Sequence, residues 1–133
     1  MHTHADPQLL ALIERYFDAV YTGNAALLAT LFDDGAQVYG DIDGRPYHQP
    51  VAAYLLAVAG RDSPARRGEP FLMRTLGIDQ AGSIANVKLY SPMLGFRYQL
   101  YLTLILRAGN WLIVNKTFTH IPALPTEETS CPT

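Results

Sequence analysis

The stretch YQLYLTLILRAGNWLIVNKTF, residues 98–118, decides the fold of this chain. Two runs of aromatic and aliphatic residues flank a short Ala-Gly-Asn segment, a composition typical of two strands joined by a tight turn. The same period-two pattern extends back to Phe71 and predicts a sheet of consecutive antiparallel strands. The expected strands are about 70–79, 83–91, 95–107 and 111–120. The expected turns are 79–83, 91–95 and 108–110.

Upstream of this sheet, apolar residues recur at helical spacing. Asp6 and Pro7 form an N-cap and first-turn pair, which predicts a helix from about 6 to 21 that stops near Thr22-Gly23. Its apolar stripe consists of Leu9, Ile13, Tyr16, Phe17 and Val20. Asn24 is expected to cap a shorter helix with Gly35 as its C′ glycine. The inward residues of that helix are Leu28, Leu31 and Phe32.

A strand, a turn and a third helix are expected between the second helix and the sheet. AQVYGDI, residues 36–42, predicts a short strand. GDIDGRPYHQP, residues 40–50, predicts a turn, because Gly44 and Pro46 do not continue a strand comfortably. Pro50 then opens a helix at about 50–60, and an exposed polar loop follows at 61–70.

This order of elements predicts an α+β fold in a single domain that spans residues 1–133. Three N-terminal helices are expected to pack on one strongly curved antiparallel sheet. The core covers about residues 6–120, and residues 121–133, with three prolines, are expected to be a mobile tail. A sheet that curves around a helix encloses a cone, and a cone leaves a pocket.

Composition and charge exclude several classes of protein. Apolar residues make up 49% of the 133, so a substantial core is available. The formal net charge is −2, with no basic run, which argues against a nucleic-acid partner. No apolar run reaches about 18 residues, so no membrane span is expected. Cys131 is the only cysteine and no signal peptide is visible, which favours a reducing, cytoplasmic location.

Two segments together carry a resemblance to a known superfamily. YFDAVYTGNAALLATLFDDGAQVYG, residues 16–40, holds a helix, a Gly-Asn break, a short helix ending in Leu-Phe and a first strand. LTLILRAGNWLIVNKTF, residues 102–118, reads as a closing hairpin. This order resembles the nuclear-transport-factor-2-like (NTF2-like) superfamily, a cystatin-like α+β cone with ketosteroid-isomerase-type and SnoaL-like members. The last strand is most similar to the subgroup named putative lumazine-binding proteins. The resemblance covers about residues 7–120 and implies the fold, whereas this fold hosts enzymes, binders and interaction modules alike.

The predicted pocket is apolar and lined mainly by aromatic residues. Asn115 joins them because Trp111, Ile113 and Asn115 share one face of the last strand. An amide there either recognises a polar ligand or bonds to a core hydroxyl such as that of Tyr16. The expected lining is Tyr16, Phe32, Tyr39, Tyr54, Phe71, Met73, Tyr98 and Asn115.

The candidate catalytic residues are Tyr16, Asp41 and His48. Tyr16 matches the position of the oxyanion-stabilising tyrosine of the isomerase type, although a core tyrosine is the simpler interpretation. The base of that type falls on Gly40, and its second acid falls near Thr103, where there is no carboxyl. Asp41 or His48 could supply a base instead, whereas the alternative for His48 is a solvated loop histidine.

No metal site and no cofactor are expected. Asp41–Gly44 resembles the start of a calcium loop, but its twelfth position is Ala52 rather than glutamate. His2 and His4 lack a third ligand nearby, and His120 is expected to face water. The basic residues after the third helix are expected to form a solvated loop. They are Arg61, Arg66 and Arg67.

The other face of the last strand is apolar where a monomer would carry charge. Leu112, Val114 and Phe118 share this face, which is expected to be the convex side of the sheet. Helices cover only the concave side, so we expect a homodimer through the convex side. The resemblance implies the same assembly.

Three functions remain open from the sequence. The first is a domain that binds a small, partly apolar or cyclic ligand in the cone, with no reaction assigned. The second is an isomerase, dehydratase or cyclase that uses Tyr16 with Asp41 or His48 for proton transfer. It requires one of these bases to point into the cone. The third is an interaction or dimerisation module, favoured by a pocket too small for a ligand.

Overall fold

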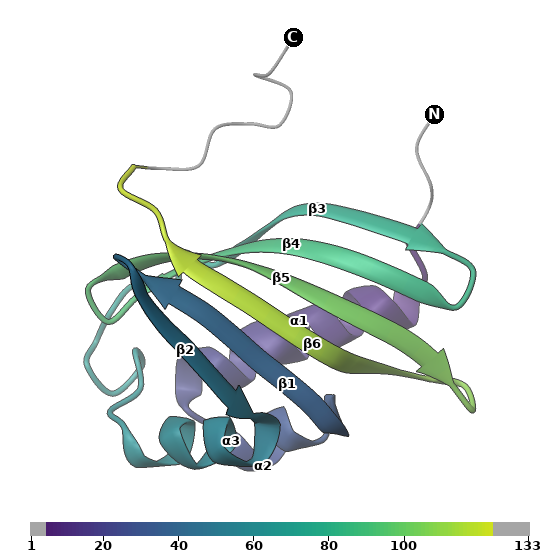
Figure 1. Ribbon diagram of the computed structural model, residues 1–133, viewed down its shortest axis with the longest axis horizontal. Coiled ribbons are helices and arrows are strands. Elements are labelled where there is room, and N and C mark those ends of the chain that lie inside the picture. The colour runs from purple at the N-terminus through teal and green to yellow at the C-terminus, as the bar shows by residue number, and fades with distance from the viewer. Residues whose placement is uncertain (1–4, 124–133) are drawn as a thin grey trace, which may run out of the picture.

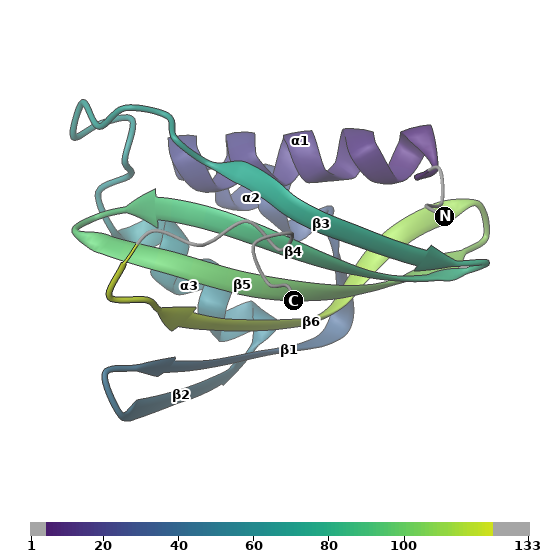
Figure 2. The same ribbon diagram turned by 90° about the horizontal axis from the view of Figure 1, so that it is seen from above.

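A curved six-stranded sheet in the order β2-β1-β6-β5-β4-β3 carries the fold in the computed structural model, which describes residues 5–123. The strands are β1 Phe32–Ile42, β2 Arg45–Pro50, β3 Arg74–Ala81, β4 Ile84–Met93, β5 Phe96–Arg107 and β6 Asn110–His120. The helices are α1 Pro7–Thr22, α2 Ala25–Ala29 and α3 Val51–Gly60. Figure 1 looks onto the sheet with α1 behind it, and Figure 2 shows α1 running along one side of the strands. We call the side facing α1 the inner face.

The α+β class and the curved sheet predicted from the sequence are confirmed. The four C-terminal strands are found close to their expected positions; the start of β3 differs most, lying at Arg74 instead of about 70. One pairing differs from the expectation of a wholly antiparallel sheet. β1 runs parallel to β6, so the first and last strands lie side by side in the middle of the sheet.

The second helix ends earlier than predicted. α2 stops at Ala29, and Phe32 already belongs to β1, where it lies opposite Ile113 of β6. Gly35 is therefore a strand residue rather than a C′ glycine. Its N–H donates to Asp33 Oδ2 at 2.9 Å, and the register of β1 shifts between Phe32 and Gln37. This local bond from the Gly35 N–H to Asp33 lies within the irregular part of β1. In the sequence, the same aspartates followed by a glycine resemble the end of a helix, which explains the wrong prediction.

The segment predicted as a turn is a hairpin. Asp43 and Gly44 both have positive φ, of 52° and 87°, as a two-residue type I′ turn requires. β2 then returns along β1 from Arg45 to Pro50. Its prolines are tolerated because β2 is the edge of the sheet, where the missing N–H removes no ladder bond from a further strand.

Helix α1 is fixed to the sheet through its N-cap residue. Asp6 is the N-cap, and its Oδ1 accepts from the Gln8 N–H at 2.8 Å. Its Oδ2 accepts from Trp111 Nε1 at 3.0 Å, and its own N–H donates to Gln80 Oε1 at 2.9 Å. The hydrogen bond from Trp111, followed by that from Gln8, lowers the pKa of Asp6. The charged cap therefore joins α1 to β6 and β3.

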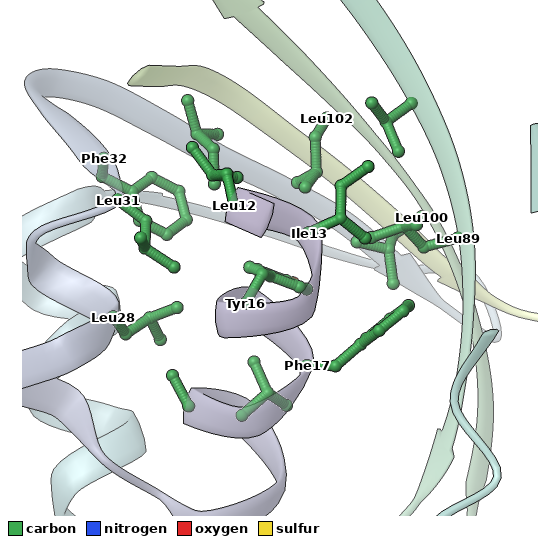
Figure 3. Packing of buried hydrophobic residues seen from close by; sticks show 14 of the residues in the cluster. Leu12, Ile13, Tyr16, Phe17, Leu28, Leu31, Phe32, Leu89, Leu100 and Leu102 are labelled. Carbon is green, nitrogen blue, oxygen red and sulfur yellow. The ribbon is translucent and has the colours of Figure 1, made fainter. Parts of the chain in front are cut away.

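The core lies between α1 and the inner face of the sheet. Figure 3 shows Leu12, Ile13 and Tyr16 of the helix directed toward leucines of the strands. Those leucines alternate along β4 and β5, because inward positions recur every second residue. They are Leu89, Leu100 and Leu102.

A β-bulge in β6 changes which residues face inward. Thr103 of β5 lies opposite Asn115, but the next residue, Leu104, lies opposite Ile113, so Val114 is an extra residue in β6. Trp111 and Ile113 are buried before the bulge. After it the inward positions are the even-numbered ones, beginning with Lys116, which is buried on the inner face.

Some expectations lie outside residues 5–123. His2, His4, Cys131 and most of the predicted tail are among these. Within residues 5–123, no group of three or more histidine, cysteine, aspartate or glutamate side chains could hold a metal ion. Of the helices in this range, none has the length and apolar character needed to cross a bilayer.

Candidate functional site

A cavity of about 50 Å³ lies on the inner face of the sheet, beside the second half of α1. It draws residues from six places along the chain: α1, α3, the residue after α3, β4, β5 and β6. Its walls combine aromatic rings and aliphatic side chains with a few polar groups. They are Tyr16, Val20, Tyr54, Arg61, Ser91, Met93, Tyr98, Leu100, Lys116 and Phe118.

Lys116 is the central polar group of this cavity. It is only 6% exposed, and its Nζ donates to Tyr54 Oη at 2.7 Å. Nζ lies 4.4 Å from the ring centroid of Tyr54 and 5.5 Å from those of Tyr16 and Phe118. These ring faces replace part of the water that the ammonium has lost. Desolvation by burial nevertheless lowers the pKa of Lys116 below its ordinary value, and the charge of Arg61 acts in the same direction.

Two phenols connect α1 and α3 to this amine. Tyr16 is 1% exposed, and burial raises its pKa well above the ordinary value of 10.0. The neighbouring hydroxyl of Tyr54 raises that pKa further. Tyr16 is thus a neutral phenol at physiological pH, at one end of a chain of polar groups that runs through Tyr54 to Lys116.

Two further polar groups in the cavity are buried without hydrogen-bond partners among residues 5–123. They are Nη2 of Arg61 and Oγ of Ser91, which belongs to a residue only 2% exposed. The sequence predicts Arg61 to be solvated with Arg66 and Arg67, and the structure corrects this expectation. Arg61 lines the cavity, whereas the side chain of Arg66 is 79% exposed. A buried donor without an acceptor is costly, so these two groups mark a site for a polar ligand or water.

Three of the eight expected lining residues line this cavity: Tyr16, Tyr54 and Tyr98. Phe32 and Met73 are buried in the adjoining core instead. Phe71 is 50% exposed and lies edge-on to Phe17 and Tyr21. The remaining two, Tyr39 and Asn115, lie elsewhere.

Asn115 lies on the outer face, opposite to the prediction. Its amide donates to Thr117 Oγ1 at 3.0 Å, and it lies opposite Thr103 in the neighbouring strand. The prediction carried the inward alternation of Trp111 and Ile113 past the bulge at Val114, where it reverses. For the same reason Phe118, expected on the convex side, is part of the cavity wall.

The candidate bases lie away from the cavity. His48 is exposed, stacks on Tyr39 with ring centroids 4.3 Å apart, and has its Nε2 2.8 Å from Gln37 Oε1. Asp41 is also exposed, and its Oδ1 accepts from the Gly44 N–H at 2.8 Å, which stabilises the β1–β2 turn. Neither residue lines the cavity with Tyr16.

Gly40 has a packing role at the position where the resembling isomerases place a base. It lies opposite Phe118 of β6, and an added Cβ would come within 2.3 Å of the Phe118 ring. The aromatic ring therefore fills the space that a side chain at residue 40 would need. His120, expected to face water, accepts at Nδ1 from the Arg97 N–H at 2.9 Å and is half-buried.

Sequence reasoning missed Lys116, Phe118, Arg61 and Ser91. For the first two a signal exists: odd-numbered positions of the last strand are apolar at 111 and 113 but polar at Asn115 and beyond. A strand with one buried face makes that change only if a bulge reverses its sides. No pattern in the sequence indicates that Arg61 turns inward, because it stands in a polar loop.

A sequence profile links this chain to one family. The family described as putative lumazine-binding matches residues 4–119, which is most of the chain. No curated protein matches.

Solved structures share this fold at low sequence identity. An NTF2-like protein of unknown function from Shewanella baltica OS155 has a TM-score of 0.74 and 18% identity, covering 87% of this chain and 93% of its own. Another from Silicibacter pomeroyi DSS-3 has a TM-score of 0.73 and 23% identity, with coverage of 86% and 93%. A putative ketosteroid isomerase from Shewanella frigidimarina NCIMB 400 has a TM-score of 0.63 and 19% identity, with coverage of 85% and 95%. At these identities the similarity shows the fold alone.

Proposed function

We propose, from the premise that this chain belongs to the family described as putative lumazine-binding, that it binds a small, partly apolar or cyclic ligand in the cavity between α1 and the sheet. One observation carries the proposal: an aromatic-walled cavity contains buried polar atoms that no described protein group satisfies. Binding sites combine apolar walls with a few polar groups in this way. A core under selection for stability alone would leave such atoms paired or replace them.

The size of the cavity limits the ligand. About 50 Å³ is far below the roughly 300–1,000 Å³ of a typical drug-sized site. The ligand is therefore small, or it enters as the walls move. Met93 is the wall residue best suited to move, because an unbranched thioether side chain repacks at little cost.

A fragment screen followed by protein NMR tests this function. Cyclic and aromatic fragments of increasing size, both neutral and charged, are added to isotope-labelled protein. The expected result is saturable shifts at Val20, Leu100 and other cavity residues, with a cut-off in fragment size. Ser91→Leu, which fills the cavity, should abolish these shifts, whereas Thr103→Leu on the outer face should leave them unchanged. Shifts confined to the outer face, or none at all, contradict ligand binding in the cavity.

The proton-transfer hypothesis has less support. It requires Asp41 or His48 to reach a substrate held by Tyr16, and both side chains are exposed outside the cavity. Among the described lining residues there is no carboxylate and no imidazole. We therefore assign no reaction to the protein.

A homodimer through the outer face of the sheet is a second proposal, compatible with the first. Its support is the exposure of large side chains there: Tyr39, Ile84 and Tyr101 are 43%, 55% and 49% exposed. Leu112 of the predicted surface pairs with Ile105 in the same region, whereas Phe118 does not belong to it. A patch of this kind on a sheet is typical of an interface. We further propose a cytoplasmic location, which the single cysteine supports because it suits a reducing compartment.

A further inference from the structure

We infer that the cavity is a site for a small organic carboxylate, whose two oxygens are held by Arg61, Lys116 and Ser91. The inference rests on the proposed ligand binding and deepens it by naming the chemical class of the ligand.

The charge of the cavity is the first argument. Arg61 and Lys116 both line it, and the described lining residues include no aspartate or glutamate. The nearest acids in sequence to Arg61 are engaged elsewhere. Asp62 lies 4.0 Å from Arg66, and Glu69 bonds to Arg67 at 3.0 Å. Two cationic side chains directed at one desolvated space repel each other unless an anion joins them.

The direction of the hydrogen bonds is the second argument. Arg61 can only donate, and its buried Nη2 has no acceptor among residues 5–123. The Ser91 hydroxyl is buried and unpaired in the same cavity. Lys116 has three donors, of which the bond to Tyr54 occupies one. The site thus contains a buried cationic donor, Arg61 Nη2, that no described acceptor satisfies, beside the unpaired hydroxyl of Ser91. An ionised carboxylate supplies only acceptors, with lone pairs on two oxygens.

Shape selects a carboxylate with a short apolar body. A guanidinium fork matches the planar pair of carboxylate oxygens. The rest of the wall is apolar, from Val20, Met93, Leu100 and Phe118, and it favours a hydrocarbon group next to the carboxylate. A cavity of about 50 Å³ has room for a body of very few carbon atoms. Water alone would satisfy the donors but would leave the positive charges of Arg61 and Lys116 without a counter-charge.

Calorimetric titration with sodium propionate at constant ionic strength tests the inference, with propionamide as the neutral ligand of the same shape. We expect one propionate per chain and at least tenfold weaker binding of propionamide. Arg61→Gln and Lys116→Met should each weaken propionate at least tenfold, and Ser91→Ala should weaken it severalfold. Arg66→Gln is the matched control from the same loop, exposed to solvent, and should bind as the original protein does.

The outcomes separate this inference from the proposed function. Equal binding of propionate and propionamide, or propionate binding that survives Arg61→Gln, overturns the carboxylate assignment and leaves ligand binding in place. If propionate fails while neutral fragments occupy the cavity, the assignment is again wrong and the proposed function stands. If neither propionate nor any fragment binds, both are wrong. Should Lys116→Met not fold by circular dichroism, Arg61→Gln and Ser91→Ala decide the question.

Discussion

Lys116 shows at the residue scale how binding chemistry and stability oppose each other. Its ammonium is removed from water and held against three aromatic rings, and the balance of these effects still lowers its pKa. A lysine whose pKa is lower in the folded state destabilises the fold at pH values below that pKa. This destabilisation decreases as pH rises toward about 10.5, the pKa of lysine in the unfolded chain.

Lys116→Met should therefore raise the free energy of unfolding at pH 7, on the order of 1 kcal/mol. The difference from the original protein should shrink as pH rises toward 10, because the original amine then loses its proton. Urea unfolding at a series of pH values measures both effects. Lys88→Met, on β4 and half-exposed, should show no such trend. A variant less stable than the original at every pH would mean that the ring contacts outweigh desolvation.

Single residues also explain where prediction from sequence stops. Tyr16 is recognisable because helical spacing places it on the inner stripe. Arg61 is not, because its burial depends on how the segment after α3 turns back onto the sheet. Gly40 is visible in the sequence, but the reason that a glycine is needed there is the ring of Phe118, which lies 78 positions later in the chain. Pairings across the sheet are set by register, which composition does not reveal.

At the scale of elements, the join between α1 and the sheet depends on one carboxylate. Asp6 caps the helix and accepts from Trp111, and both bonds lower its pKa. A carboxylate whose pKa is lowered by folding contributes stability above its unfolded pKa, near 3.8. That contribution is lost as pH falls through the folded value.

Asp6→Asn should lower the melting temperature at neutral pH by a few degrees, since asparagine still caps a helix but lacks the charge. The deficit should begin to shrink near pH 3.8 and should close as pH falls through the lower folded pKa, where the original carboxyl becomes protonated. Thermal unfolding at a series of pH values from 7 down to 2 provides the comparison. Asp62→Asn, an exposed aspartate whose ion-pair distance is 4.0 Å, serves as the control and should change little at any of these pH values. A deficit of constant size from pH 7 down to pH 2 would assign the effect to shape rather than charge.

The elements also show which sequence patterns are reliable. Three tight turns with glycine at positive φ, at Gly82, Gly95 and Gly109, fix the hairpins of the C-terminal sheet where the sequence places them. The prediction failed where a strand carries an irregularity. The bulge at Val114 reverses the faces of β6, and the break near Gly35 hides the start of β1.

At the scale of the whole molecule, the proposed dimer predicts the molecular mass of the protein in solution. The chain of 14.7 kDa should sediment at about twice that mass at micromolar concentration. Tyr101→Glu places a charge in the centre of the outer face and should yield a monomer. Leu56→Glu, on the exposed side of α3, should leave the dimer intact. Analytical ultracentrifugation over a concentration series distinguishes these cases, and a monomer mass for the original chain throughout would end the proposal.

The parallel seam between β1 and β6 has a consequence for biosynthesis. Residues near position 32 find their neighbours near position 113, and the Ile113 N–H donates to the Leu31 carbonyl across that seam at 2.9 Å. A nascent chain must therefore leave the ribosome almost completely before its first strand gains a partner on both sides. Until then, the β1–β2 hairpin exposes an unpaired strand edge, and chaperones can bind the nascent chain during that interval.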